Sequence, residues 1–200
     1  MTDGAAVRPT DRRSELIRTV YRVMARDGVH RVPLQKIAAE AGVSKGLLLY
    51  HFATKDSMVL EAMQWVLEAT AERIRRQLAS GDENRTLANV VDAIWIDPEA
   101  NHDFFRFYLD GVEHQTRSPG FEEFGDRGRH IIDSLYADLI ATGVSQGIFD
   151  VVDPALTAVQ MRAVIEGMFL QWLQRGDWRT CHGEYKELCL AALDRLLHTG

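Results

Sequence analysis

Apolar residues recur at intervals of three and four along most of this chain, and this spacing constrains the fold more than any other feature. Such a period places the apolar side chains on one face of an α-helix, whereas the alternation typical of half-buried strands is nearly absent. Of the residues, 46% are hydrophobic, and only five prolines and fifteen glycines interrupt the pattern. We therefore expect an all-α fold in which 200 residues bury a core without disulfides or metal.

Glycine and proline residues divide the pattern into separate helices. The first helix is expected over residues 11–27 and should end at Gly28. Pro33 suits the first turn of a short second helix that ends at Gly42, because proline lacks an N–H that would have no partner there. A third short helix and a long one, from Lys55 to about Ala79, should follow. Later helices are expected at 84–96, 101–116, 121–143, 154–175 and 183–197.

The chain shows no sign of export or of membrane insertion. Its start, MTDGAAVRPTDRR, lacks an apolar run, and the most apolar later stretch, AVIEGMFLQWL, is short and interrupted by Glu166. We therefore expect a cytoplasmic protein. Cys181 and Cys189 lie eight positions apart on one expected helix, beyond bridging distance, and should be buried thiols.

Charge divides the chain into a basic head and an acidic body. Residues 1–56 hold ten Lys and Arg against six Asp and Glu, a net charge of +4. Residues 57–200 hold 13 against 23, a net charge of −10. A local basic surface attracts a phosphate backbone even when the whole molecule is acidic. We accordingly expect a head over 1–56 that binds DNA and an acidic helical body over 57–200, although a chance fluctuation in surface charge would give the same count.

The most informative stretch of the head is LQKIAAEAGVSKGLLLYHF. Ala38 is a small residue where two helices would cross, and Gly42 lies where the chain must turn sharply. Ser44 can cap the following helix. Two short helices joined in this way hold the second one outward, where it can enter a DNA major groove about 12 Å wide.

The exposed face of this second helix predicts the contacts with DNA. Gly46 allows close approach of the backbone, and Leu47 offers an apolar contact to a thymine methyl. Taken singly, each of these residues has an ordinary structural explanation, since Leu47, Leu48 and Leu49 could all be core. Their occurrence in one register favours the functional explanation. The predicted DNA-binding residues are Ser44, Lys45, Gly46, Leu47, Tyr50, His51 and Lys55.

Over residues 11–60 the sequence resembles the tetracycline-repressor-type (TetR) regulators, whose heads have the approximate pattern of IAAEAGVSKGLLLYHFATKD in this chain. The resemblance implies contact with DNA by Lys45, Gly46, Leu47, Tyr50, His51 and Lys55. This chain departs from the family pattern at two places. Val32 and Pro33 replace the usual Thr or Ser, and Leu47 and Leu49 replace a Thr and an aromatic residue.

The same resemblance implies a body with a small-molecule pocket, and a dimer interface made by the last two helices. The penultimate helix presents Val159, Ala163, Glu166, Gly167 and Leu170 near one face, and the last presents Leu188, Ala191, Ala192 and Leu196. A homodimer would present two heads to a two-fold symmetric operator. The same stripes could instead complete a monomeric core.

Aromatic residues of the body could line a pocket for the small-molecule effector, and polar neighbours such as Arg106, Glu113 and Gln171 could orient it. Core packing explains most of these aromatic residues equally well. The candidate ligand-binding residues are Trp65, Trp95, Phe104, Phe107, Tyr108, His114, Phe169 and Trp172.

We also considered an enzyme. Glu99 and His102 have the Glu-x-x-His spacing of carboxylate-bridged metal bundles, but such sites need a second copy, which the sequence lacks. No phosphate loop or nucleophile elbow occurs, and we expect no catalysis, cofactor or bound metal. The sequence thus predicts a ligand-responsive, dimeric regulator, usually a repressor, that binds operator DNA through residues 34–55. The alternatives are an all-helical metal-dependent enzyme and a protein-interaction module.

Overall fold

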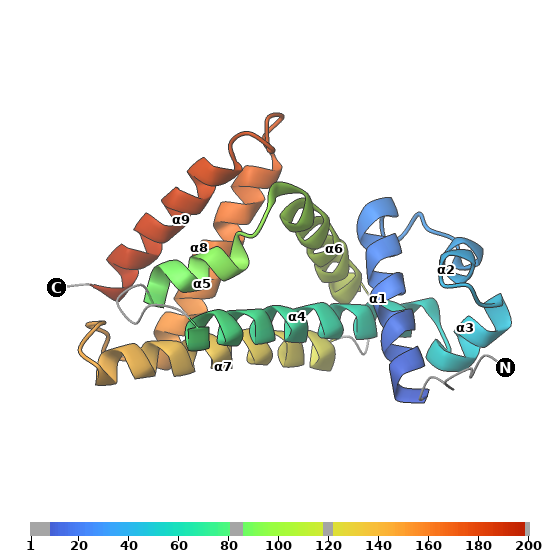
Figure 1. Cartoon of the computed structure of the whole chain (residues 1–200), viewed down its shortest axis with the longest axis horizontal. Helices are drawn as coiled ribbons and strands as arrows, with labels where there is room; N and C mark the ends of the chain where they lie inside the picture. Colours follow the sequence, from blue (N-terminus) through green and yellow to red (C-terminus); the bar gives the residue numbers. More distant parts are fainter. Residues whose placement is uncertain (1–8, 81–85, 118–121, 199–200) are drawn as a thin grey trace, which may run out of the picture. The chain divides into compact units, whose positions relative to one another are not determined.

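The computed structural model describes residues 9–80, 86–117 and 122–198, and within these ranges the fold is all helical (Figure 1). An isolated bridge between Asp150 and His198 is the one strand-like pairing in this part of the chain. The helices are α1 (Pro9–Asp27), α2 (Leu34–Glu40), α3 (Lys45–Phe52), α4 (Lys55–Ser80), α5 (Thr86–Ile94), α6 (Pro98–Arg117), α7 (Glu122–Ser145), α8 (Pro154–Leu173) and α9 (His182–Leu197).

These helices confirm the predicted all-α fold, and most of their ends lie within two or three residues of the expected positions. The start of α6 differs from the expected helix over 101–116, because Pro98 is its first helical residue. Asp97 explains the difference: its Oδ1 accepts a hydrogen bond from the amide of Ala100 at 2.8 Å. A capping carboxylate followed by proline in the first turn starts a helix.

The described helices form two compact units. The first contains Met1–Val66 together with Arg106–Pro119, so the C-terminal half of α6 belongs with α1, α2, α3 and the first half of α4. Its fully buried side chains include Leu16, Met24, Ile37, Leu48, Phe52 and Met58. Burying a side chain of this size contributes about 1.5–3 kcal/mol, so these contacts stabilise the positions of the short helices α2 and α3.

Two glycines make the turns that shape the first unit. Gly28 ends α1 with a φ of +88°, and its amide donates to the carbonyl of Met24. Gly42 follows α2 with a φ of +65°. Any other residue would be strained at these angles, so both glycines act as predicted stops.

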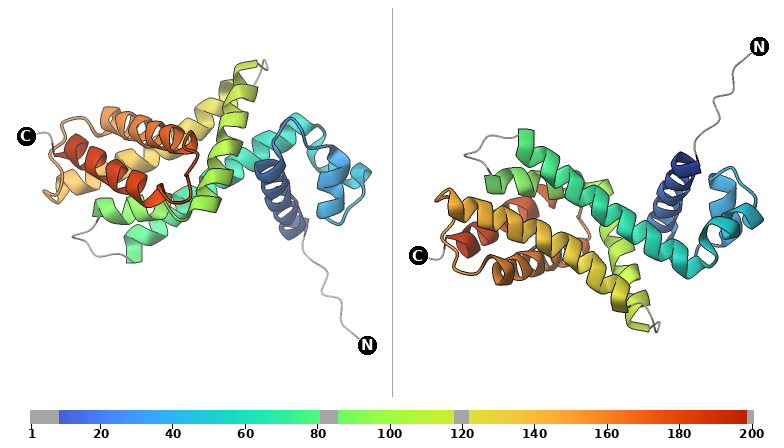
Figure 2. Two further views of the ribbon diagram at one scale, coloured as in Figure 1. Left: turned by 90° about the horizontal axis from the view of Figure 1, so that it is seen from above. Right: turned by 90° about the horizontal axis from the view of Figure 1, so that it is seen from below.

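The second unit contains Leu67–Phe105 together with Gly120–Gly200. In it, α8 packs against both α7 and α9, as the views in Figure 2 show, and α5 packs against α9. An ion pair of 2.6 Å joins Arg162 of α8 to Asp133 of α7. Cys181 and Cys189 are buried and free, as predicted.

Within the described ranges, no helix combines the length and the apolar character that a membrane span requires.

Candidate DNA interface

Local chemistry fixes the start of α3. Ser44 has an extended backbone, and its Oγ accepts a hydrogen bond from the amide of Leu47 at 3.1 Å, which confirms the predicted cap. The preceding helix is anchored by Ile37 and Ala38, which are 0% and 3% exposed. The turn at Gly42 therefore holds α3 against a buried support.

The rotation of α3 separates its three consecutive leucines. Leu48 is completely buried, Leu49 is half-buried, and 42% of Leu47 is exposed. Tyr50 is 83% exposed, whereas Phe52 returns to the core at 2%. One face of this helix is thus anchored in the core, and the other carries a leucine and a tyrosine in solvent.

The polar residues predicted for DNA contact lie at both ends of this exposed face. Lys45 and Gly46 are exposed in the first turn, and Lys45 forms no ion pair with any residue that the structure describes. His51 is half-buried in the last turn, with its ring centroid 5.6 Å from that of Tyr50. Ser44, Lys45, Gly46, Leu47, Tyr50 and His51 therefore occur on one short, capped element.

The structure places Lys55 differently from these residues. Its Nζ donates to the carbonyl oxygens of Val32 at 2.9 Å and His30 at 3.4 Å, in the loop between α1 and α2. Burial lowers the pKa of this ammonium, although the neighbouring Asp56 raises it. Lys55 is thus occupied within the first unit, and its charge fixes a loop.

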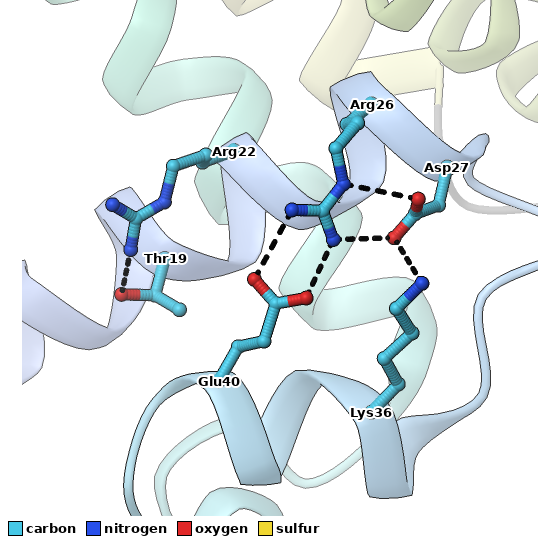
Figure 3. Close-up of polar contacts among 6 residues, drawn as sticks. All are labelled: Thr19, Arg22, Arg26, Asp27, Lys36 and Glu40. Carbon is cyan, nitrogen blue, oxygen red and sulfur yellow. Dashed lines mark hydrogen bonds and ion pairs between the residues drawn. The ribbon is translucent and has the colours of Figure 1, made fainter.

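Other basic residues of the head are also paired locally. Figure 3 shows Arg26 at the end of α1 between Asp27 and Glu40, with Lys36 of α2 on the other side of Asp27. The separations are 2.8 Å for Arg26–Asp27, 2.5 Å for Arg26–Glu40 and 3.0 Å for Lys36–Asp27. Hydrogen bonding to Arg26 lowers the pKa of both carboxyl groups. Arg26 and Lys36 are therefore neutralised locally, between the end of α1 and α2.

Sequence reasoning missed Arg13. This α1 residue donates from Nη1 to the carbonyl oxygen of His51 at 2.7 Å and from Nη2 to Glu61 Oε2 at 2.6 Å. Its guanidinium carbon lies 5.1 Å from the ring centroid of Phe52. The three partners come from the last turn of α3 and from α4, so one side chain connects three helices.

In the second unit, four of the aromatic residues pack together. Trp95 stacks on Phe169 with centroids 4.0 Å apart and planes at 8°. Phe105 stacks on Phe169 as well, at 4.9 Å and 22°. Trp172 meets Phe169 edge-on at 6.0 Å. We call these four residues the aromatic cluster; it includes Trp95, Phe169 and Trp172 of the predicted ligand-binding set.

The other predicted ligand-binding residues do not join the aromatic cluster as a group. Trp65 and Phe107 belong to the first unit, where both contact the ring of Tyr21. His114 also belongs there, with its Nε2 3.2 Å from Asp56 Oδ1. Tyr108 lies in the first-unit half of α6. Phe104 is in the second unit, half-buried, with its ring 6.4 Å from that of Phe105.

Glu99 and His102, the pair considered for a metal site, have other contacts. Glu99 accepts a hydrogen bond from Arg179 at 3.0 Å. His102 stacks on Trp178 with centroids 4.1 Å apart, and Arg179 lies over the same indole ring. Within the ranges that the structure describes, no three or more His, Cys, Asp or Glu residues form a group suited to a metal ion. These contacts give the two residues a structural role in holding the segment between α8 and α9.

Two family models match most of the chain. Residues 16–62 match the bacterial regulatory proteins of the tetR family, and residues 83–198 match the C-terminal part of BetI-type transcriptional repressors. The transcriptional repressor KstR2 of Rhodococcus jostii is 29% identical to this chain over 139 residues, which are 69% of this chain and 68% of that protein.

Solved structures show the same architecture. A TetR-family regulator from Rhodococcus sp. has a TM-score of 0.76 at 21% identity, over 94% of this chain and 99% of its own. A transcriptional regulator from Saccharomonospora viridis, crystallised in complex with choline, has a TM-score of 0.71 at 26% identity, over 89% and 96% of the two chains. Together with the capped and outward-facing α3, these matches identify the chain as a member of the TetR family, a ligand-responsive DNA-binding transcriptional regulator with a BetI-type C-terminal part.

Proposed function

We propose that α3 is the recognition helix, which enters the major groove of operator DNA. The observation that carries this proposal is the exposure of Tyr50 and Leu47 on a helix whose opposite face is buried. An exposed apolar patch on an anchored element marks a candidate binding surface. The proposed contact residues are Ser44, Lys45, Gly46, Leu47, Tyr50 and His51, and Lys55 contributes by fixing the loop beside them.

We further propose that two copies of the chain associate through α8 and α9. These neighbouring helices expose four large apolar side chains. On α8, Leu156 is 57% exposed, Val159 43% and Leu170 43%, and on α9, Leu188 is 47% exposed. Ala163 and Ala191 are small residues on the same exposed surfaces, which permits close approach of helices. An isologous interface of this kind would give a two-fold symmetric pair of heads.

For the effector, we propose a small cation with an oxygen acceptor that binds at the aromatic cluster. Aromatic faces attract quaternary ammonium groups, and the similar regulator from Saccharomonospora viridis was crystallised with choline. The Trp95 indole N–H is buried, has no nitrogen or oxygen acceptor among the described residues, and has the thiol of Cys189, a weak acceptor, beside it. A hydroxyl or carboxylate oxygen on the ligand would satisfy that donor.

The rings of the aromatic cluster are stacked in contact, so a ligand must separate them in order to bind. Binding can lower the affinity for DNA only if the ligand prefers a conformation that binds DNA less well. This mechanism makes the protein a repressor that is released by its effector, consistent with the repressor names of its relatives.

Selection of duplexes from a random-sequence library by the wild-type protein tests the DNA interface and the dimer together. We expect the selected duplexes to share a two-fold symmetric site, with half-sites about one helical turn apart. A single asymmetric half-site would contradict the dimer, and a selected pool without any shared sequence would contradict the recognition helix.

Choline and its neutral isostere 3,3-dimethylbutan-1-ol test the effector class, because they differ only in the charged atom. Each compound is added to the complex with the selected duplex while fluorescence anisotropy follows the release of DNA. We expect choline to release the DNA, and the isostere to be weaker by about tenfold, since a desolvated cation–π contact is worth up to about 2 kcal/mol. Equal effects of both compounds would refute recognition of a cation, and no effect of either would refute this effector class without affecting the DNA interface.

A further inference from the structure

An unusual turn joins the recognition helix to α4. Only Ala53 and Thr54 separate Phe52, which ends α3, from Lys55, which begins α4. Ala53 has φ +56° and ψ −55°, and the amide of Thr54 donates to the carbonyl of Phe52 at 2.5 Å. This is a three-residue γ-turn of the rare, strained type. Ala53 is the one non-glycine residue with a positive φ in the part of the chain that the structure describes.

A strained backbone persists only where the surrounding structure holds the chain on both sides. On the α4 side, the amide of Thr54 lies 3.2 Å from Ser57 Oγ, and the amide of Ser57 donates to Thr54 Oγ1 at 3.0 Å. Lys55 adds its hydrogen bond to Val32. These contacts fix the start of α4, whereas the end of α3, although Phe52 anchors it in the core, needs a second support that sets its direction.

Arg13 supplies that second support. The carbonyl of His51 is one of the last four carbonyls of α3, which have no partner within the helix. Arg13 donates to this carbonyl at 2.7 Å and to Glu61 of α4 at 2.6 Å, while its guanidinium lies near Phe52. The side chain therefore joins the two helices on either side of the γ-turn.

The Arg13–Glu61 pair is partly exposed, so we expect it to affect the orientation of α3 more than the stability of the protein. The Arg13 side chain is 42% exposed and that of Glu61 is 30% exposed. Ion pairs in such partly solvated places add little to the free energy of unfolding. The geometry of two hydrogen bonds from one planar guanidinium, however, fixes the direction of the group that it holds.

We propose that Arg13 is a positioning residue for DNA binding: it holds the end of α3 at the angle that the Ala53 turn makes with α4. The proposal rests on the proposed role of α3 as recognition helix. Arg13 acts on DNA through α3 and makes no contact with DNA itself. Weakening this support, or relaxing the turn, therefore lets α3 change direction while the core of the head remains folded.

The test compares Arg13→Met and Ala53→Gly with the wild type by anisotropy, on the selected duplex and on a scrambled duplex, over a range of salt. Arg12→Met is the matched control, because Arg12 pairs with Glu15 on its own helix. We expect Arg13→Met to weaken binding to the selected duplex about tenfold, the order of one lost base contact. Binding to the scrambled duplex and the salt slope should be unchanged, and Arg12→Met should retain the preference for the selected duplex.

Ala53→Gly separates positioning from stability, because glycine adopts a positive φ without strain. We expect its unfolding midpoint to equal or exceed that of the wild type while its affinity for the selected duplex falls. If Arg13→Met does not fold, Arg13→Gln takes its place; its shorter side chain keeps a polar group but cannot reach the His51 carbonyl and Glu61 together, so the same loss of affinity is expected.

Three results would overturn the proposal. The first is wild-type affinity in both Arg13→Met and Ala53→Gly. The second is a salt slope smaller by about one in Arg13→Met, with equal losses on both duplexes, which is the signature of a direct phosphate contact. The third is a wild-type protein that does not discriminate between the duplexes, which would refute the DNA interface itself.

Discussion

The ammonium of Lys55 lies 2.9 Å from the carbonyl oxygen of Val32, inside the first unit. The family resemblance assigns Lys55 to DNA contact. In this structure, however, Lys55 already has a hydrogen-bond partner within its own protein. Loop and helix are thereby joined, because Val32 precedes α2 and Lys55 begins α4.

The contact predicts that Lys55→Ala lowers stability. A part-buried carbonyl that loses its partner costs about 1 kcal/mol in the free energy of unfolding, which urea denaturation measures. Lys45→Ala is the control, since Lys45 is exposed and should change stability by less than about 0.5 kcal/mol. Equal stability of the two variants would show that the Lys55 contact does not hold the loop.

Tyr50 and Leu48 lie two positions apart on α3, and we expect their substitution by alanine to have opposite effects on stability and DNA binding. Tyr50→Ala removes a side chain that is 83% exposed, so stability should change by less than about 0.5 kcal/mol while the affinity for the selected duplex falls. Leu48→Ala empties a fully buried position and should cost about 2–5 kcal/mol. Paired unfolding and binding curves check both statements. A large loss of stability in Tyr50→Ala would mean that this ring belongs to the core.

Leu170→Asp should separate the proposed dimer into monomers. It places a charge at a position of α8 that is 43% exposed in one chain and would be desolvated between two chains. Sedimentation velocity measures the change in mass. Val112→Asp, at a 38% exposed position of α6, is the control and should leave the dimer intact. The α8 interface would be refuted if Leu170→Asp remained a dimer.

A buried histidine predicts a pH dependence of stability. His182 Nε2 lies 2.8 Å from Asn101 Oδ1, and the amide of Asn101 donates to the carbonyl of Ile94. Burial, and then the charge of Lys186, lower the pKa of His182 below its ordinary value near 6.5. The unfolded chain therefore takes up a proton at a higher pH than the folded chain does.

Stability from this residue is accordingly complete above the unfolded pKa and is lost as the pH falls through the folded pKa. Urea unfolding between about pH 7.5 and 5 should show this loss in the wild type, across the usual histidine range. The variant His182→Gln, which keeps a polar group but does not titrate, should have a flatter profile. The same slope in both proteins would exclude His182 as its source.

Features that depend on neighbouring residues could be predicted from the sequence. The helical period, the turn at Gly42 and the Ser44 cap all arise from side chains a few positions apart, and all three occur as expected. Leu47 is exposed and Leu48 is buried, as expected from the neighbouring helices and not from the three leucines themselves, because their burial depends on how α3 rotates against the rest of the head. A run of identical apolar residues contains no information about that rotation.

Contacts of long side chains were equally beyond prediction. Lys55 bonds to a carbonyl 23 residues away, and Arg13 to one 38 residues away. Both carbonyls belong to the backbone, so no residue type at the receiving end marks them in the sequence. The aromatic residues of α6 are distributed over both units, because the boundary between the units falls between Phe105 and Arg106 within this helix. The sequence does not mark this boundary.

We propose above all that the exposed face of α3 recognises a DNA sequence. The most direct test is fluorescence anisotropy over a range of salt, with DNA from upstream of the gene that encodes this chain. We expect binding that is tighter than to a random duplex of equal length, weakens steeply as salt increases, and loses its sequence preference in Tyr50→Ala. Equal affinity of the wild-type protein for the upstream and the random duplex at every salt concentration would contradict the claim.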